Sequence, residues 1–359
     1  MTKAEDSIYI IAEAGVNHNG DIQRALEMID AAAEAGADCV KFQTFIPEAL
    51  ASQHAEKASY QQKNANSQES QLQMLKQLAL PLEQFQTLQE QCDRKGIDFL
   101  SSPFDRQSAD FLINQSRLKT IKLGSGELTN APLLWQIADS GVDLILSTGM
   151  ASKDEINQAL SVLSLGYQNI TPDAHSCFDS FDLDILKNKV SLLHCTTAYP
   201  CPDDQVDLRA MQTLAEWSQL PTGFSDHTQG TAIAIAAVAR GASILEKHFT
   251  LDKNLAGPDH QASLEPDELS KLVKACQRVT QALGKAEKSI GTEERENAQV
   301  ARKGLVASKK IAKGELFSTD NLTSKRPQAG LAPANYWRLL GTPAKQDYDA
   351  DQPIKQTIE

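Results

Sequence analysis

Apolar residues along this chain alternate between two kinds of segment. Short runs rich in Val, Ile, Leu and Phe have the length of buried strands, and the longer segments between them place apolar residues three and four positions apart, as helices do. The expected strands are residues 8–12, 39–43, 98–101, 120–123, 144–147, 190–195, 222–224 and 243–246. Eight strands that alternate with helices predict an α/β fold, a closed (β/α)8 TIM barrel, with its active site at the carboxyl ends of the strands.

The alternation stops after the helical pattern that ends near Leu283. Residues 285–302 are polar and charged without an apolar period, and apolar residues return at 304–307 and 314–317. We therefore expect a catalytic barrel over residues 1–284, a linker over 285–302 and a small domain over 303–359. A domain this small buries little core by itself and gains stability by docking elsewhere.

Two connections between expected strands are long and polar, residues 46–76 and 166–189. A long polar loop on the top face of a barrel is more often a lid or an oligomer contact than a segment without a function. The role of the 166–189 insertion stays open.

Composition narrows the classes of partner. The formal net charge of -12 argues against nucleic acid and against anionic membranes, because both would repel the chain. No apolar run approaches the roughly 18 residues of a membrane span, and residues 1–6 lack the pattern of a signal peptide. The six cysteines form no Cys-x-x-Cys motif, which favours reduced, packed thiols. We expect a cytoplasmic protein.

Candidate chemistry lies at the ends of the expected strands. His227 and His248 end two successive strands, where two imidazoles can share one divalent metal ion. Carboxylates (Asp226, Glu246) and lysines (Lys41, Lys122) lie at or near other strand ends. A metal, an acid or base and an anion site on one face indicate metal-assisted chemistry on an anionic substrate.

Five motifs occur in order along the chain: IAEAGVNHNG at 11–20, VKFQT at 40–44, SGE at 125–127, STGM at 147–150 and GPDH at 257–260. Together they resemble the sialic acid synthase family, and the carboxyl-terminal segment resembles that family's mostly-β, antifreeze-like SAF domain. The resemblance implies condensation of phosphoenolpyruvate with an N-acylated amino hexose, giving a nine-carbon 2-keto sugar acid and phosphate. It also implies a divalent metal, manganese first with magnesium or cobalt as alternatives, and a domain-swapped homodimer.

The resemblance also assigns residues to roles. It implies that Lys41, Ser102, Lys122, Ser125 and Ser147 contact phosphoenolpyruvate, that Gln43, Tyr199 and Asp259 contact the sugar, and that Arg326 reaches the active site of the partner subunit. Thr197 stands where other members carry Asn, and its hydroxyl can still donate a hydrogen bond. A carboxylate must orient or deprotonate the attacking water, and both Glu13 and Glu127 are candidates.

Two other functions remain open at this stage. A Schiff-base aldolase on the same barrel would use Lys41 or Lys122 as the nucleophile. A non-catalytic sugar-binding protein would bind its ligand without releasing phosphate. The sequence does not fix the acceptor, and four stay open: N-acetylmannosamine, a 2,4-diacetamido-trideoxy hexose that leads to a legionaminic-type acid, a pseudaminic-type precursor and a phosphorylated sugar.

Overall fold

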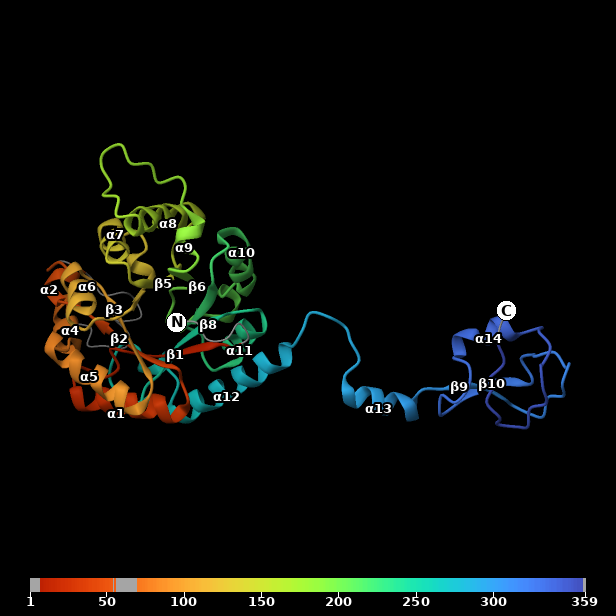
Figure 1. The fold of residues 1–359 in the computed structure, drawn as a ribbon. Helices are drawn as coiled ribbons and strands as arrows, with labels where there is room; N and C mark the ends of the chain where they lie inside the picture. Colours follow the sequence, from red (N-terminus) through yellow and green to blue (C-terminus); the bar gives the residue numbers. More distant parts are fainter. Residues whose placement is uncertain (1–6, 54, 56–69, 358–359) are drawn as a thin grey trace. The chain divides into compact units, whose positions relative to one another are not determined.

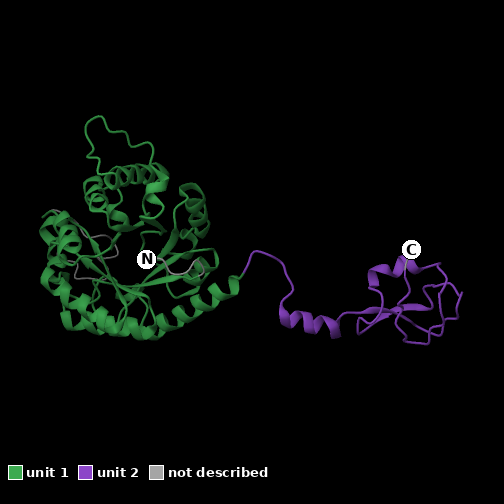
Figure 2. Ribbon diagram, viewed as in Figure 1, with its two compact units in different colours: residues 1–284 green, residues 285–359 purple. Residues whose placement is uncertain are grey.

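The computed structural model describes residues 7–53, 55 and 70–357, so residues 1–6, where the sequence shows no signal-peptide pattern, lie outside the described part. The chain divides into two compact units, residues 1–284 and 285–359 (Figure 2). Among the described residues, no helix combines the length and the apolar character that crossing a membrane requires.

The first unit is built on eight parallel strands (Figure 1). They are β1 (Tyr9–Gly15), β2 (Cys39–Thr44), β3 (Asp98–Pro103), β4 (Thr120–Leu123), β5 (Asp143–Ser147), β6 (Val190–His194), β7 (Thr222–Asp226) and β8 (Ile244–His248). Their order in the sheet is β3-β2-β1-β8-β7-β6-β5-β4, and the two outer strands of this order, β3 and β4, also lie side by side. The predicted (β/α)8 barrel is confirmed, with all eight strands near their expected positions.

Strand alternation gives the barrel interior two layers. Side chains that alternate along a strand point to opposite faces, so Ile11 and Glu13 on β1 both point inward. The lower layer is an apolar cluster of Tyr9, Ile11, Cys39, Leu100, Ile145, Leu193 and Ile244. One inward position further along the strands, the buried residues are polar or charged, among them Glu13, Lys41, Ser102, Ser147 and Glu246. The alternation that builds the apolar layer therefore also places the polar and charged side chains next to it, toward the carboxyl ends of the strands.

Helices cover the outer face of the strands. The helix α1 (Ile22–Ala35) begins at Asp21, whose carboxylate accepts hydrogen bonds from the amides of Gln23 and Arg24, and it ends at Gly36 in the left-handed conformation. Its neighbours on the outside are α5 (Leu82–Lys95) and α12 (Pro266–Leu283), and α7 (Ala131–Asp139) packs on α8 (Lys153–Tyr167) in the same way. Their apolar faces join the outward strand residues in one large core.

The connection over residues 46–76 is more structured than its polar composition suggested. It contains α2 (Pro47–Leu50) and the start of α4 (Gln71–Leu78), while residues 54 and 56–69 lie outside the described part. Ser70 and Gln73 form a reciprocal capping box that begins α4. The insertion at 166–189 contains the short helix α9 (Leu183–Leu186).

The second unit has its own small core. Strands β9 (Gly304–Ala307) and β10 (Leu322–Lys325) pair antiparallel, and isolated bridges join Ile311 to Tyr348 and Leu316 to Pro343. Leu305, Ile311, Phe317, Leu322, Tyr348 and Ile354 are buried between these segments. The segment expected to be a plain linker contains the helix α13 (Thr292–Ala301), none of whose residues is buried.

Candidate active site

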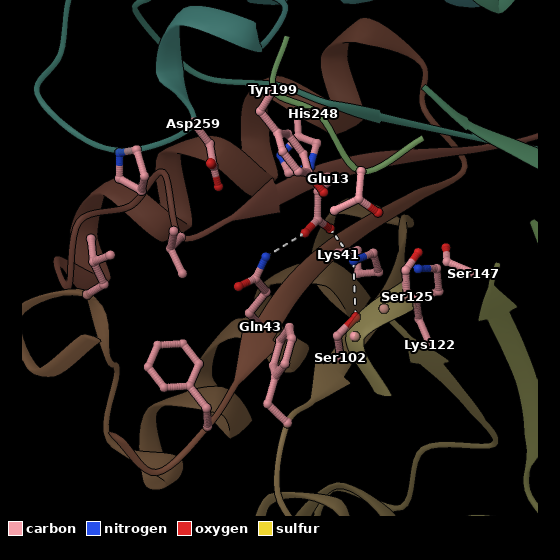
Figure 3. A pocket seen from close by; sticks show the side chains of 18 of the residues that line it. Glu13, Lys41, Gln43, Ser102, Lys122, Ser125, Ser147, Tyr199, His248 and Asp259 are labelled. Atoms are coloured by element: carbon pink, nitrogen blue, oxygen red, sulfur yellow. Dashed lines mark hydrogen bonds and ion pairs between the residues drawn. The ribbon is translucent and has the colours of Figure 1, made fainter. Parts of the chain in front are cut away.

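A cavity of about 290 Å³ opens at the carboxyl ends of the barrel strands. The cavity is lined by twelve residues to which the sequence analysis assigned a role: Glu13, Lys41, Gln43, Ser102, Lys122, Ser125, Ser147, Thr197, Tyr199, His227, His248 and Asp259. Figure 3 labels all of these except Thr197 and His227. In Figure 3, Glu13 and Lys41 lie between Lys122 and Ser147 on one side and Gln43 and Asp259 on the other.

The predicted catalytic residue Glu127 does not line this cavity. Glu127 lies in a short 3-10 turn after β4, outside the cavity lining, and its carboxylate accepts a 2.7 Å hydrogen bond from the Asn130 amide. Arg326 is exposed on the second unit, directly after β10. Of the two candidate carboxylates, the geometry therefore favours Glu13.

Four buried charges form a chain across the cavity floor. The Lys41 ammonium lies 2.5 Å from the Glu13 carboxylate and 3.6 Å from that of Glu246. The Lys122 ammonium lies 3.5 Å from the other oxygen of Glu246, which also accepts a 2.8 Å hydrogen bond from Ser225. The two lysines and two carboxylates cancel in formal charge. A substrate with several negative charges therefore needs a further cation, or a proton on one carboxylate, to bind tightly.

Burial and neighbouring charges shift the pKa values of these groups in different directions. Desolvation raises the pKa of Glu13, although Lys41 opposes that shift. Glu246 is also desolvated, but Lys122 and Lys41 on either side bring its pKa below the usual range. Desolvation lowers the pKa of Lys122, and Glu246 offsets only part of that effect. Of the two carboxyl groups, Glu246 therefore stays ionised, and Glu13 takes up a proton more readily.

Small hydroxyl groups surround this charged floor. Ser102 accepts a 3.1 Å hydrogen bond from Lys41. Ser125 accepts a 2.9 Å bond from the Gly149 amide, and a Cβ at Gly149 would stand 2.8 Å from the Ser125 hydroxyl, so glycine is required for this contact. The buried Ser147 hydroxyl has no hydrogen-bond partner among the described residues. An unpaired donor in the same cavity as Lys41 and Lys122 suits a phosphate or carboxylate oxygen.

His227 and His248 lie together at the ends of β7 and β8, with ring centroids 5.6 Å apart. The Tyr199 ring packs against both, at 4.2 Å from His227 and 5.8 Å from His248. His227 Nδ1 lies 2.7 Å from the Thr196 carbonyl oxygen, so this nitrogen carries the proton. Nε2 lies 3.4 Å from the Ser225 hydroxyl, which donates its proton to Glu246, so the Nε2 lone pair stays available. His248 Nδ1 is buried without a hydrogen-bond partner among the described residues.

These two imidazoles fit a divalent metal ion by the chemistry of their donors. Desolvation lowers the pKa of both rings, so both are neutral and can act as ligands. No group of three or more His, Cys, Asp and Glu side chains in the described part of the chain could hold an ion. A metal on His227 and His248 would therefore keep several positions for water or substrate, as catalytic sites do.

Asp259 enters the cavity from the loop that follows β8. Burial and the nearby Glu13 raise the pKa of its carboxyl to about 7. The loop is tied to the first strand-to-helix loop, because Asn19 donates to the Ala256 carbonyl and Asn17 donates to Ser263, which in turn donates to the Asp259 carbonyl. The motif at residues 17–20 therefore holds the loop that carries Asp259.

Part of the cavity was not predictable from the sequence pattern. Glu246 stood out only as a residue near a strand end, and Ser225 was not considered, although both point inward by strand alternation. A set of apolar side chains on one side of the cavity was also missed, because three of them lie on α4, in a connection whose composition predicted a loop.

The fold and this cavity define a barrel with a floor of paired buried charges beside a histidine pair. A family model described as the NeuB family matches residues 28–288, and a model described as the SAF domain matches residues 302–357. The chain is 46% identical over 347 residues to the N,N'-diacetyllegionaminic acid synthase of Campylobacter jejuni, covering 97% of this chain and 98% of that protein. It is 42% identical over 334 residues to the synthase of the same name from Legionella pneumophila, covering 93% and 89%.

The solved structures agree. A crystal structure of N-acetylneuraminic acid synthetase from Leptospira borgpetersenii in complex with citrate superposes with a TM-score of 0.69 at 33% identity, covering 83% of this chain and 94% of that one. The chain therefore belongs to the NeuB family of sugar acid synthases, with a carboxyl-terminal SAF domain.

Proposed function

We propose that this enzyme condenses phosphoenolpyruvate with the open-chain aldehyde of an N-acylated amino hexose, giving a nine-carbon 2-keto sugar acid and inorganic phosphate. The observation that carries the proposal is the placement of Lys41, Lys122 and the unpaired Ser147 hydroxyl in the same cavity as the His227 and His248 pair. In this proposal an anion site would lie beside a site for an electrophilic oxygen. The synthase names of the relatives support the same reaction.

In this reaction the methylene carbon of the enol forms a bond to the aldehyde carbon, and the aldehyde oxygen takes up a proton. Water then adds to carbon 2 of the former phosphoenolpyruvate, which bears the phosphate oxygen, and loses a proton. The resulting hemiketal phosphate expels inorganic phosphate and leaves the keto group. Glu13 would hold or move the proton of that water; its raised pKa and the contacts of its carboxylate with Lys41 and Gln43 support this role. Lys41, Lys122 and Ser147 would hold the phosphate and carboxylate of phosphoenolpyruvate.

His227 and His248 are the proposed ligands of a divalent metal, manganese first and magnesium or cobalt as alternatives. When bound, the metal would supply Lewis acidity toward the aldehyde oxygen and positive charge for an otherwise neutral floor. The sugar would then bind on the side of the cavity that is lined by Asp259, Gln43, Tyr199 and Thr197.

We also propose a homodimer in the cytoplasm, in which each SAF domain caps the barrel of the partner. Three features support it: the SAF core is small, residues 285–302 are long enough to cross to another subunit, and Arg326 is exposed. Five of the six free cysteines are buried, which suits a reducing compartment.

The direct test is a phosphate-release assay on the full chain with manganese, phosphoenolpyruvate and an N-acylated amino hexose, with the product identified by mass spectrometry. We expect phosphate and the sugar acid in equal amounts, and only when both substrates are present. A Schiff-base aldolase would instead give a lysine adduct when borohydride is added with a keto acid. Binding of the sugar without phosphate release would show a non-catalytic protein.

A further inference from the structure

Asp226, which the sequence placed among the charged groups of the active face, does not line the cavity. It ends β7, and its partner in the register of the sheet is Lys247 on β8. Side chains alternate along a strand, so these two residues point outward, whereas His227 and His248, one position later, point inward. The Lys247 ammonium lies 2.8 Å from the Asp226 carboxylate, and both side chains are 0% exposed. A buried ion pair therefore lies directly behind the two histidines.

This ion pair belongs to a set of hydrogen bonds that encloses His227. Asp226 accepts from both the amide and the hydroxyl of Thr228, each at 2.8 Å, and so forms a turn around His227. Lys247 donates to Asp226 and also to the Thr228 carbonyl, at 2.5 Å. The residues on both sides of His227 are therefore bound to one side chain of β8, and that side chain belongs to the residue before His248.

The backbone pairing between β7 and β8 ends before it reaches the histidines. Its last pair is Asp226 with Lys247. His248 is still part of β8, and it pairs in register with Glu13 of β1. His227 lies one residue beyond the end of β7. The hydrogen bond from Lys247 to the carbonyl that follows His227 therefore extends the connection between the two strands past the end of their backbone pairing.

The other hydrogen bonds of His227 go to the loop that follows β6. Its carbonyl accepts from the Cys201 amide, and its Nδ1 donates to the Thr196 carbonyl. Residues 195–202 form neither helix nor strand. A loop is a less rigid support than a strand of the barrel. Lys247 therefore supplies the attachment of the His227 turn to the strand that carries His248.

Net stability does not account for such a pair. The cost of taking two charges out of water largely offsets their attraction, so a buried ion pair adds little over apolar residues of the same size. Its hydrogen bonds do set one arrangement of the groups they join, because charged donors and acceptors bind at short and well-defined distances. A metal ion on two histidines has a comparable demand, since both ring nitrogens must lie about 2.0–2.1 Å from it.

Resting on the metal site proposed above, we propose that Asp226 and Lys247 are positioning residues that hold His227 at the spacing from His248 that a divalent ion requires. Neither residue touches the ion or the substrate in this account. The anion site should be unaffected, because Lys41, Lys122 and Ser147 lie on β2, β4 and β5. Loss of the ion pair should therefore weaken metal binding and leave phosphoenolpyruvate binding largely unchanged.

The test uses the double variant Asp226→Asn with Lys247→Met in the full chain. Lys247→Met alone would leave the Asp226 carboxylate buried without a cation and so would confound metal binding with folding. An asparagine oxygen at position 226 can still accept from Thr228, so the turn is kept and the connection to β8 is lost. Titration of the metal-free protein with Mn²⁺, followed by the electron paramagnetic resonance signal of the free ion, measures the affinity. We expect it to fall about 10-fold or more.

Turnover gives a second readout of the same variant. At a Mn²⁺ concentration that saturates the wild type, the double variant should be slow, and a higher Mn²⁺ concentration should restore much of its rate. The KM for phosphoenolpyruvate should stay close to the wild-type value. A defect in the general structure of the barrel would not be corrected by metal in this way.

Two control variants separate positioning from general loss of structure. Thr44 and Ser101 form a buried hydroxyl pair at 2.6 Å between β2 and β3, also outside the cavity lining, and no histidine is next to either residue. Thr44→Val with Ser101→Ala should leave the Mn²⁺ affinity unchanged. Leu160→Ala removes a fully buried side chain of α8, so it should lower the melting temperature without changing the Mn²⁺ affinity.

A double-mutant cycle then locates the effect. In a chain that already carries His227→Ala, the residue that the ion pair positions is gone. Adding Asp226→Asn with Lys247→Met to that chain should therefore change the Mn²⁺ affinity less than about 2-fold. An equal loss with and without His227, or wild-type affinity in the double variant, would overturn the positioning role and leave the metal site standing. Absence of Mn²⁺ binding by the wild-type protein would instead overturn the metal site and the positioning role together.

Discussion

Glu13 and Lys41 lie opposite each other in the register of β1 and β2, and their side chains form a buried ion pair at 2.5 Å. Both side chains are less than 5% exposed, so neither charge is solvated by water. The stability of the pair therefore depends on the close contact between the two side chains. The register of β1 and β2 sets this contact, so the register also fixes the charges that line the cavity. Gly15 assists, because its φ of +54° allows the bulge that shifts the register after this pair, beside the Gln43 amide.

Lys41→Met should affect stability as well as activity. It leaves Glu13 buried without its cation, and breaking a buried pair from one side costs about 3–5 kcal/mol. We expect a large loss of the free energy of unfolding in urea and no phosphate release. A second change, Glu13→Gln, should restore much of the stability but none of the activity.

The control for this experiment is Lys95→Met, which removes a pair with Asp30 whose side chains are 37% and 38% exposed. That change should cost less than about 1 kcal/mol. Lys122→Met should mainly raise the KM for phosphoenolpyruvate, since Glu246 keeps Lys41 as a partner. If Lys41→Met were as stable as the wild type, the buried pair would not have the energetic role described here.

Metal binding should depend on both histidines. Titration of the purified protein with Mn²⁺, followed by the electron paramagnetic resonance signal of the free ion, should show one site per chain. His248→Ala and His227→Ala should each weaken this site at least 10-fold and reduce turnover by orders of magnitude, and a chelator should abolish activity. Full turnover by metal-stripped protein would rule out the metal assignment.

Stability should depend on pH through Asp259. A carboxyl whose pKa is raised by folding binds its proton more tightly in the folded state, so its contribution is complete below the unfolded value of 3.8 and is lost as pH rises to about 7. The shift corresponds to about 4 kcal/mol. Asp259→Asn should therefore be more stable than the wild type in urea at pH 8, with the difference shrinking toward pH 4. A constant difference across this range would show that Asp259 does not titrate as described.

Mixed subunits test the exchange of SAF domains. His248→Ala and Arg326→Ala chains should each be inactive, and mixing them under conditions of subunit exchange should recover activity. Such dimers hold one site with both residues native only if Arg326 acts on the partner's barrel. Native mass spectrometry would confirm the exchange, and background activity in exchanged dimers would argue against the swapped arrangement.

Strand alternation made much of this site predictable. Residues such as Lys41, His227 and His248 follow short apolar runs, and the carboxyl ends of parallel strands must converge. Glu127 also follows a strand, but the chain turns into a 3-10 helix there and Asn130 binds its carboxylate, which no strand pattern indicates. The apolar side of the cavity was not predictable for another reason. It joins residues after three strands to the helix α4 within a polar connection, and only tertiary packing brings them together.

The most direct test of the central claim uses phosphoenolpyruvate labelled with ¹⁸O in the oxygen that joins carbon 2 to phosphorus. Because water adds to carbon 2 and the hemiketal phosphate then loses phosphate, the label should leave in the inorganic phosphate, and only when the amino hexose is present. Mass spectrometry of the phosphate and of the nine-carbon product measures this. Label retained in the keto group of the product, or phosphate released without acceptor, would contradict the account.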